Sequence, residues 1–238
     1  MKKISITFLL GILLCSISIK SISQQDQRIH ASYIFAFGRD AISEELNYWL
    51  GRGNFSISQL MEFHKSAFTD YPSRHKETII RSYIDAIGRN PSENEMKYWM
   101  NRVDNYTQLL NKHIQILQSN RWENEKIIRL AYSMVFHRVP IGAEINFWKK
   151  KAVTPFFLMV GYLEDYKRKN RSAAGKNSNI NLQYLPSVTT VLLSPAIAAE
   201  VFKFIRDNGN TIVPNFIKLG RKNMIVTGKG DVAIELVN

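Results

Sequence analysis

Apolar residues recur every three or four positions between residues 27 and 169, which is the period of amphipathic α-helices. The clearest stripe consists of Ile80, Tyr83, Ile84 and Ile87. Comparable stripes precede and follow it, separated by short polar segments. The pattern predicts nine helices, packed as a solenoid or a compact helical array.

One motif occurs three times in this region, at intervals of 50 and 49 residues. Each copy has a tyrosine, then a glycine or histidine followed by arginine, then a glutamate, then an aromatic residue followed by tryptophan. Its arginine, glutamate and tryptophan are Arg39, Glu45 and Trp49; Arg89, Glu95 and Trp99; and Arg138, Glu144 and Trp148. We therefore predict a mainly α protein with three tandem three-helix repeats in residues 24–169, at about 27–70, 77–120 and 126–169.

The glycines and polar residues of the motif predict where helices begin and end. Gly38 and Gly88 are placed to end the first helix of a repeat, because glycine adopts the left-handed conformation at little cost. His137 stands there in the third copy and is a costlier substitute. Asn90 is placed to cap the second helix of the second repeat, with Pro91 at its first position.

The repeated arginines and glutamates permit two interpretations. Glycoside hydrolysis uses two carboxyl groups about 5 to 10 Å apart, and the glutamates could supply them. Alternatively, each arginine grips the glutamate of its own repeat and fixes the corner between two helices. A catalytic pair is needed once, whereas this pair occurs three times, so we interpret it as structural. The tryptophans are expected in the core, and Tyr48, Tyr98 and Phe147, one position earlier, are candidates for ligand contact.

Other reactive sites are not indicated. The sequence contains no G-x-S-x-G elbow and no calcium loop, and its five histidines form no pair at metal-binding helical spacing. Residues 228–231 (GKGD) are typical of a hairpin turn and lack the length of a phosphate-binding loop. We predict no catalytic residue, no metal site and no cofactor.

The N-terminus has the pattern of a secretory signal peptide. Basic residues precede an apolar run at residues 4–19, and small residues follow, so we expect cleavage of residues 1–23 before Gln24. A membrane anchor is the alternative, although the run is shorter than the roughly 20 residues of a span. Lipid attachment at Cys15 is less favoured because Leu14 is bulky. The expected location is the periplasm or the cell surface.

The charge balance favours anionic neighbours. The chain has 32 basic and 20 acidic residues, and removal of residues 1–23 leaves 29 and 20. This surplus suits an anionic glycan, an acidic protein or peripheral contact with a membrane surface. Nucleic acid is not expected as a partner of an exported protein. At 45% hydrophobic and 22% charged residues, the chain is typical of globular proteins.

The pattern changes after the last repeat. Residues 170–184 are basic, polar and without helical period, as in a linker. Residues 185–238 predict a small α+β segment, with a helix from Pro195 to about Arg206 and a β-hairpin around residues 228–231. We expect this segment to cap the exposed end of the helical array.

The motif at residues 83–99 resembles the tandem "LGR-x-P…YW" repeat of a bacterial domain-of-unknown-function family found in exported proteins. It is also similar to the helical phycobilisome linker domain. The resemblance covers about 145 of the 238 residues and weakens at His137 and Val139. It implies a binding or structural role without catalysis.

We therefore expect an exported, non-catalytic binding or scaffolding protein. The alternatives are a cell-envelope carbohydrate-active enzyme and an adaptor subunit of an outer-membrane or secretion complex. A cleft with two unpaired carboxylates favours the enzyme, and a flat apolar patch of several hundred Å² favours the adaptor. Exposed aromatic rings rimmed by lysine and arginine favour glycan binding. The identity of the ligand and the oligomeric state stay open.

Overall fold

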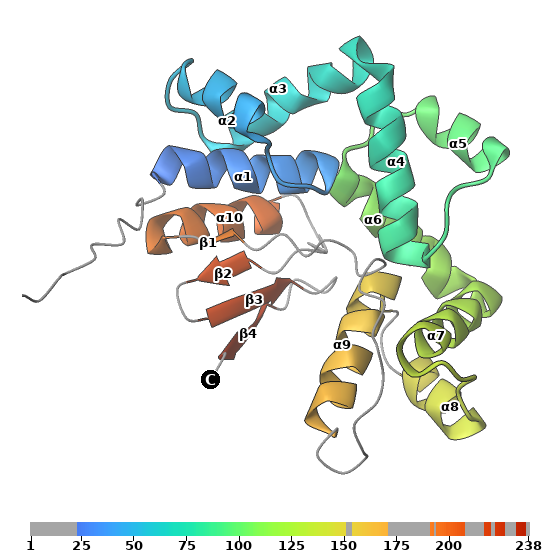
Figure 1. Ribbon diagram of the computed structural model, residues 1–238. Helices are drawn as coiled ribbons and strands as arrows, with labels where there is room; N and C mark the ends of the chain where they lie inside the picture. The colour runs from blue at the N-terminus through green and yellow to red at the C-terminus, as the bar shows by residue number, and fades with distance from the viewer. Residues whose placement is uncertain are drawn as a thin grey trace, which may run out of the picture.

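A computed structural model describes residues 23–150, 154–170, 191–192, 194–207, 217–219, 222–226 and 232–236. The prediction of a mainly helical chain is confirmed for these residues (Figure 1). The helices are α1 (Gln24–Phe37), α2 (Ser43–Leu50), α3 (Ile57–Asp70), α4 (Pro72–Ile87), α5 (Glu93–Met100), α6 (Tyr106–Ser119), α7 (Arg121–Phe136), α8 (Gly142–Lys150), α9 (Phe156–Lys169) and α10 (Pro195–Asp207). The expected signal peptide lies outside the described residues except for Ser23, and the expected linker except for Asn170. Within the described ranges, none of the helices combines the length and the apolar character that a membrane span requires.

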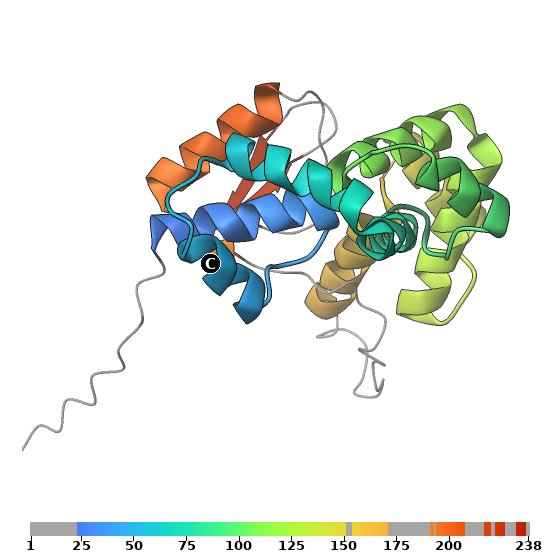
Figure 2. The same ribbon diagram turned by 90° about the horizontal axis from the view of Figure 1, so that it is seen from above.

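The first nine helices follow one another as three groups of three: α1–α3, α4–α6 and α7–α9 (Figure 1). In each group the first and third helices pack closely, and the short second helix packs on the first. The third helix of one group also packs on the first helix of the group before it, as α6 does on α1 and α9 on α4. The view from above shows the same succession (Figure 2).

The first helix of each group begins several residues earlier than its apolar stripe predicts. Ser23 accepts the backbone N–H of Asp26 and thereby caps α1. Pro72 begins α4, and Asn120 caps α7 through the backbone N–H of Glu123. The first turns of these helices are polar apart from the exposed Trp122, and they do not join the apolar stripe. The apolar pattern therefore predicted later starts, at residues 27, 77 and 126.

The predicted start of α5 was wrong. The helix begins at Glu93, and its cap is Ser92 instead of Asn90. Ser92 Oγ accepts the backbone N–H of Glu95, and Glu95 Oε2 accepts the backbone N–H of Ser92 at 2.7 Å. The backbone carbonyl of Asn90 accepts a bond from Arg89 instead. The glutamate of the motif therefore determines which residue caps the helix.

The described residues form two main hydrophobic clusters. One joins α1, α2 and α3 to α10, and the other joins α4 to α9. Buried residues of α10, including Val201 and Ile205, pack against α1 and α3. Glu200 of α10 accepts hydrogen bonds from Arg28 Nε at 2.7 Å and from the backbone N–H of Ile57 at 2.9 Å. The C-terminal helix thus covers the first group (Figure 1).

Four short strands lie beside α10 in the described part of the chain (Figure 1). They are β1 (Val191–Leu192), β2 (Ile217–Leu219), β3 (Lys222–Val226) and β4 (Val232–Leu236). β1 pairs with β2 in parallel, and β2, β3 and β4 pair antiparallel, with Met224 opposite Ile234. Residues 227–231 lie outside the described residues, so the hairpin turn stays a prediction.

Candidate functional site

The repeated arginine and glutamate contact each other in all three groups. Each guanidinium donates two parallel hydrogen bonds to the carboxylate of the glutamate six residues later, at 2.6–2.8 Å. The pairs are Arg39–Glu45, Arg89–Glu95 and Arg138–Glu144. Each glutamate also accepts the backbone N–H of the residue that precedes the second helix. These bonds fix the corner between the first and second helices.

The same bonds hold the pKa of each glutamate below its ordinary value. At Glu95 the hydrogen bond from Arg89 lowers the pKa to about 2. At Glu45 burial acts to raise the pKa, but the bonds from Arg39 and from a backbone N–H outweigh it and lower the pKa. A carboxyl group with a lowered pKa is ionised at neutral pH and cannot act as a general acid. The lowered pKa values therefore argue against the general-acid role of a glycoside hydrolase for these glutamates.

The three repeated tryptophans lie in the core and make one equivalent hydrogen bond. The indole Nε1 donates to the hydroxyl of the tyrosine sixteen residues earlier. The pairs are Trp49–Tyr33 (3.1 Å), Trp99–Tyr83 (2.8 Å) and Trp148–Tyr132 (3.2 Å). Because the indole donor is satisfied inside the fold, these tryptophans hold the second helix against the first.

A buried histidine completes the core of the first two groups, and sequence analysis did not single it out. His64 and His113 each occupy the eighth position of the third helix, with Nε2 3.0 Å from the hydroxyl of Ser32 or Ser82. Both rings meet the repeated tyrosine edge-on. The spacing of these residues in the sequence could have revealed the Ser–His pair, because the two serines are 50 residues apart and the two histidines 49, as the repeats are.

The third group lacks this polar pair. Ala131 precedes Tyr132, as Ser82 precedes Tyr83, and Leu163 is the eighth residue of α9. Both partners of the hydrogen bond are therefore replaced together by apolar residues.

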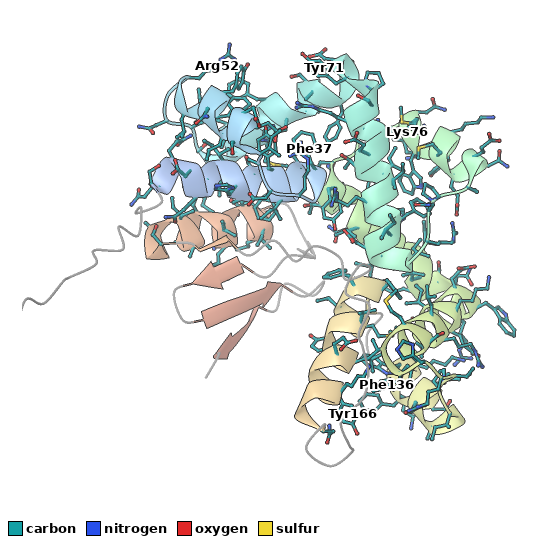
Figure 3. All side chains as sticks on the ribbon, in the orientation of Figure 1. Phe37, Arg52, Tyr71, Lys76, Phe136 and Tyr166 are labelled. Carbon is teal, nitrogen blue, oxygen red and sulfur yellow. The ribbon has the colours of Figure 1, made fainter. Side chains whose placement is uncertain are left out.

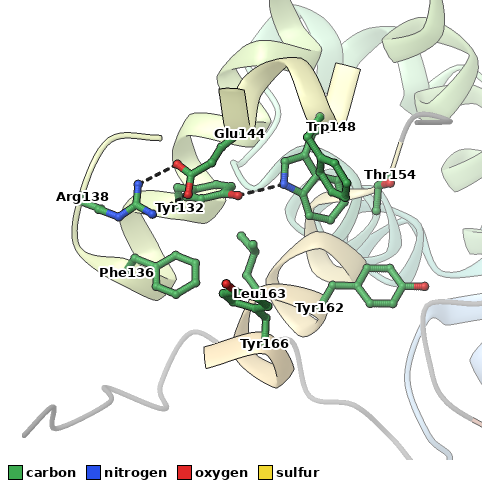
Figure 4. Close-up of a pocket in the computed structure, with 10 residues that line it drawn as sticks. Tyr132, Phe136, Arg138, Glu144, Trp148, Thr154, Tyr162, Leu163 and Tyr166 are labelled. Carbon is green, nitrogen blue, oxygen red and sulfur yellow. Dashed lines mark hydrogen bonds and ion pairs between the residues drawn. The ribbon is translucent and has the colours of Figure 1, made fainter. Parts of the chain in front are cut away.

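A cavity of about 820 Å³ opens beside Leu163 (Figure 4). We call it the aromatic cavity, because six aromatic residues line it: Tyr132, Phe136, Phe147, Trp148, Tyr162 and Tyr166. Arg138, Glu144 and Thr154 add polar groups to the wall. Phe136 and Tyr166 lie together at the α7–α9 end of the molecule (Figure 3). A concave, mostly apolar site with a few polar groups is typical of ligand pockets.

The three candidates for ligand contact lie in different settings. Tyr48 and Tyr98 are half exposed, and the guanidinium carbons of Arg52 and Arg102 lie 4.5 and 4.4 Å from their ring centroids. These arginines therefore cover one face of each ring. Phe147 is 53% exposed and lines the aromatic cavity. Of the three, Phe147 is thus the residue that the structure places at a concave site.

A second, smaller cavity of about 310 Å³ lies between α3 and α6. Its wall includes Glu62, Lys65 and Gln108, together with Phe204 of α10. Within the described residues, no three histidine, cysteine, aspartate or glutamate side chains gather as metal ligands would.

Comparison with known proteins gives no match to a protein family, to a curated protein or to a solved structure. The resemblance of residues 83–99 to the exported repeat family therefore stays a prediction. The case for a function depends on the geometry of the three groups and of the aromatic cavity.

Proposed function

We propose that the chain is an exported, non-catalytic binding and scaffolding protein made of three copies of one three-helix structural unit. Residues 1–23 are its cleaved signal peptide, and the C-terminal segment, with its hairpin, caps the first unit. It acts in the periplasm or at the cell surface. The observation that supports this best is the Arg–Glu pair, which occurs in three groups with the same bonds and consumes the carboxylates that catalysis would need.

The aromatic cavity of the third unit is the ligand-binding site of this proposal. It is concave, whereas an adaptor for a protein partner would present a flat apolar patch. The net positive charge of the chain suits an envelope partner, because anionic glycans, lipid head groups and acidic proteins are abundant there.

The proposal is tested by fractionating native cells, crosslinking in the intact cell and identifying what is captured. We expect the protein in an envelope or extracellular fraction, beginning at Gln24 and crosslinked to an envelope protein or glycan. Recovery from the cytoplasm with residues 1–23 intact would contradict export. Hydrolysis of an envelope glycan that disappears in the Glu95→Gln or Glu144→Gln variant would contradict the non-catalytic role.

A further inference from the structure

The aromatic cavity lies in the third group, and the other two groups have different side chains at the position of Tyr162. In the first group Phe63 packs on Trp49, with ring centroids 5.4 Å apart. In the second, Lys112 lies 5.8 Å from the centroid of Trp99 and donates to Asp104. The corresponding residue of the third group is Tyr162, which lines the aromatic cavity.

We propose that the aromatic cavity binds a neutral pyranose ring of a cell-envelope glycan. This inference rests on the proposed function and names the ligand class of its site. Tyr162 and Tyr166 of α9 are 44% and 62% exposed, and Phe147 of α8 is a further aromatic residue of the cavity wall. The C–H face of a pyranose packs on aromatic rings of this kind, which retain both an apolar face and a polar edge.

The polar groups of the wall suit hydroxyl groups. A sugar hydroxyl both donates and accepts hydrogen bonds, and the wall includes the Glu144 carboxylate and the Arg138 guanidinium. Tyrosine hydroxyls at the mouth add further donors and acceptors. The cavity volume of about 820 Å³ lies within the range of small-ligand sites.

The charge of the wall favours a neutral sugar over an acidic one. Arg138 donates two hydrogen bonds to Glu144, so the two charges of the wall compensate each other. An anionic ligand would lie near the Glu144 carboxylate, and the charge of Arg138 is already compensated by that carboxylate.

The same wall disfavours a proline-rich peptide. Aromatic grooves that bind such peptides do so with side-chain donors that reach peptide carbonyls. The indole N–H of Trp148 is engaged by Tyr132. A proline-rich peptide would therefore lack this indole donor, and we expect it to bind less tightly than a glycan.

The test is isothermal titration calorimetry on the full chain without residues 1–23, with cellohexaose, chitohexaose and maltoheptaose as neutral probes. We expect at least one of them to bind, and the Phe147→Ala and Tyr166→Ala variants to lose at least tenfold in affinity. Tyr98→Ala is the matched control, because Tyr98 holds the position of Phe147 in the second group and lies away from the cavity. Circular dichroism melts establish that each variant is folded.

A second variant changes the polarity of the cavity wall at Leu163 without removing an aromatic ring. Ala131→Ser combined with Leu163→His installs the pair of the other two groups, and we expect it to stay folded and to bind the sugar less tightly. The inference is overturned if none of the neutral probes binds, or if polygalacturonic acid or a decaproline peptide binds more tightly than all of them. A pull-down that compares how much wild-type protein and how much Tyr166→Ala variant is retained on isolated envelopes separates the proposed function, which is envelope binding, from the claim that the aromatic cavity is the binding site. Equal retention would overturn the cavity as the site and leave envelope binding in place, whereas retention of neither would count against the proposed function itself.

Discussion

At the scale of single residues, the Ser–His pair shows how a buried polar contact is satisfied in this fold. The hydroxyl of Ser82 donates to the backbone carbonyl of Ile79, so His113 donates its Nε2 proton to the serine oxygen. Burial lowers the pKa of His113 to about 3, and the ring is neutral at physiological pH. Nδ1 of His113 has no hydrogen-bond partner among the described residues, so a second proton would be buried without compensation.

The first prediction concerns acid stability. The unfolded histidine binds a proton near pH 6.5 and the folded one near pH 3, so stability falls as pH decreases between these values. Because of His113, the free energy of unfolding should be about 2 kcal/mol lower at pH 5 than at pH 7. Ser82→Ala with Leu in place of His113 copies the third group and should remove this loss while changing stability little at pH 7. Urea unfolding at both pH values measures it, and an unchanged pH dependence would disprove the assignment.

The buried pair of Asp85 and Tyr106 should have the opposite pH dependence. The Tyr106 hydroxyl donates to Asp85 at 2.5 Å, and burial raises the pKa of Asp85 to about 6. Below pH 3.8 Asp85 is protonated in both the folded and the unfolded chain, and the fold is not penalised. As pH rises through 6 the unfolded chain is stabilised by ionisation of Asp85, so the free energy of unfolding decreases.

The second prediction follows from that sign. The third group has Met134 and Phe156 at the positions of this pair, so Asp85→Met with Tyr106→Phe copies a combination the fold already accepts. The stability of this double variant relative to wild type should rise by about 2 kcal/mol between pH 4 and pH 7.5. A parallel pair of pH–stability curves would refute this account.

At the scale of helices, the Arg–Glu pair has the same geometry in each group but lies in a different environment. The side chain of Glu45 is 9% exposed, whereas that of Glu144 is 25% exposed. Arg74 lies 3.5 Å from Glu45, which adds a second cation to the buried carboxylate. The energetic contribution of the pair should therefore differ among the groups.

The third prediction compares two of these pairs. Arg39→Ala leaves a buried carboxylate with Arg74 as its remaining cation and should cost about 2 kcal/mol. Arg138→Ala breaks a more exposed pair and should cost about 1 kcal/mol or less. Urea unfolding of both variants measures the difference, with Arg52→Ala as a surface control. Equal losses would show that burial does not set the strength of the pair.

The helices and the repeated pairs could be predicted because each leaves a periodic or recurrent signal. The Arg–Glu pair recurs three times and was visible without coordinates. The start of α5 could not be predicted from Asn90 and Pro91, because Glu95, held by Arg89, pairs with Ser92. The aromatic cavity could be predicted only at Phe147, since the rings of α9 reach it through helix packing that the sequence pattern does not encode.

At the scale of the whole molecule, contacts between groups explain why the motif has glycine twice and histidine once. Gly38 has φ 69°, and a Cβ there would lie 2.5 Å from the ring of Tyr106 in the next group. At Gly88, with φ 81°, a Cβ would lie 2.6 Å from Leu130 and 3.0 Å from Phe156. His137 has φ 54° and is exposed, and no fourth group follows α9 in the described residues.

The last prediction separates the backbone requirement from the contact between groups. A left-handed conformation costs a residue with a side chain about 1 kcal/mol relative to glycine, wherever it stands. Gly88→Ala should cost more, about 2 to 4 kcal/mol, because its Cβ also meets Leu130 and Phe156. His137→Gly should gain up to about 1 kcal/mol, because it relieves only the backbone. Thermal and urea unfolding of the two variants measure both terms. The Gly88→Ala variant could instead lose no more free energy of unfolding than the His137→Gly variant gains. Close packing between groups would then not be the reason for the glycine, and the other helix contacts would hold the groups together.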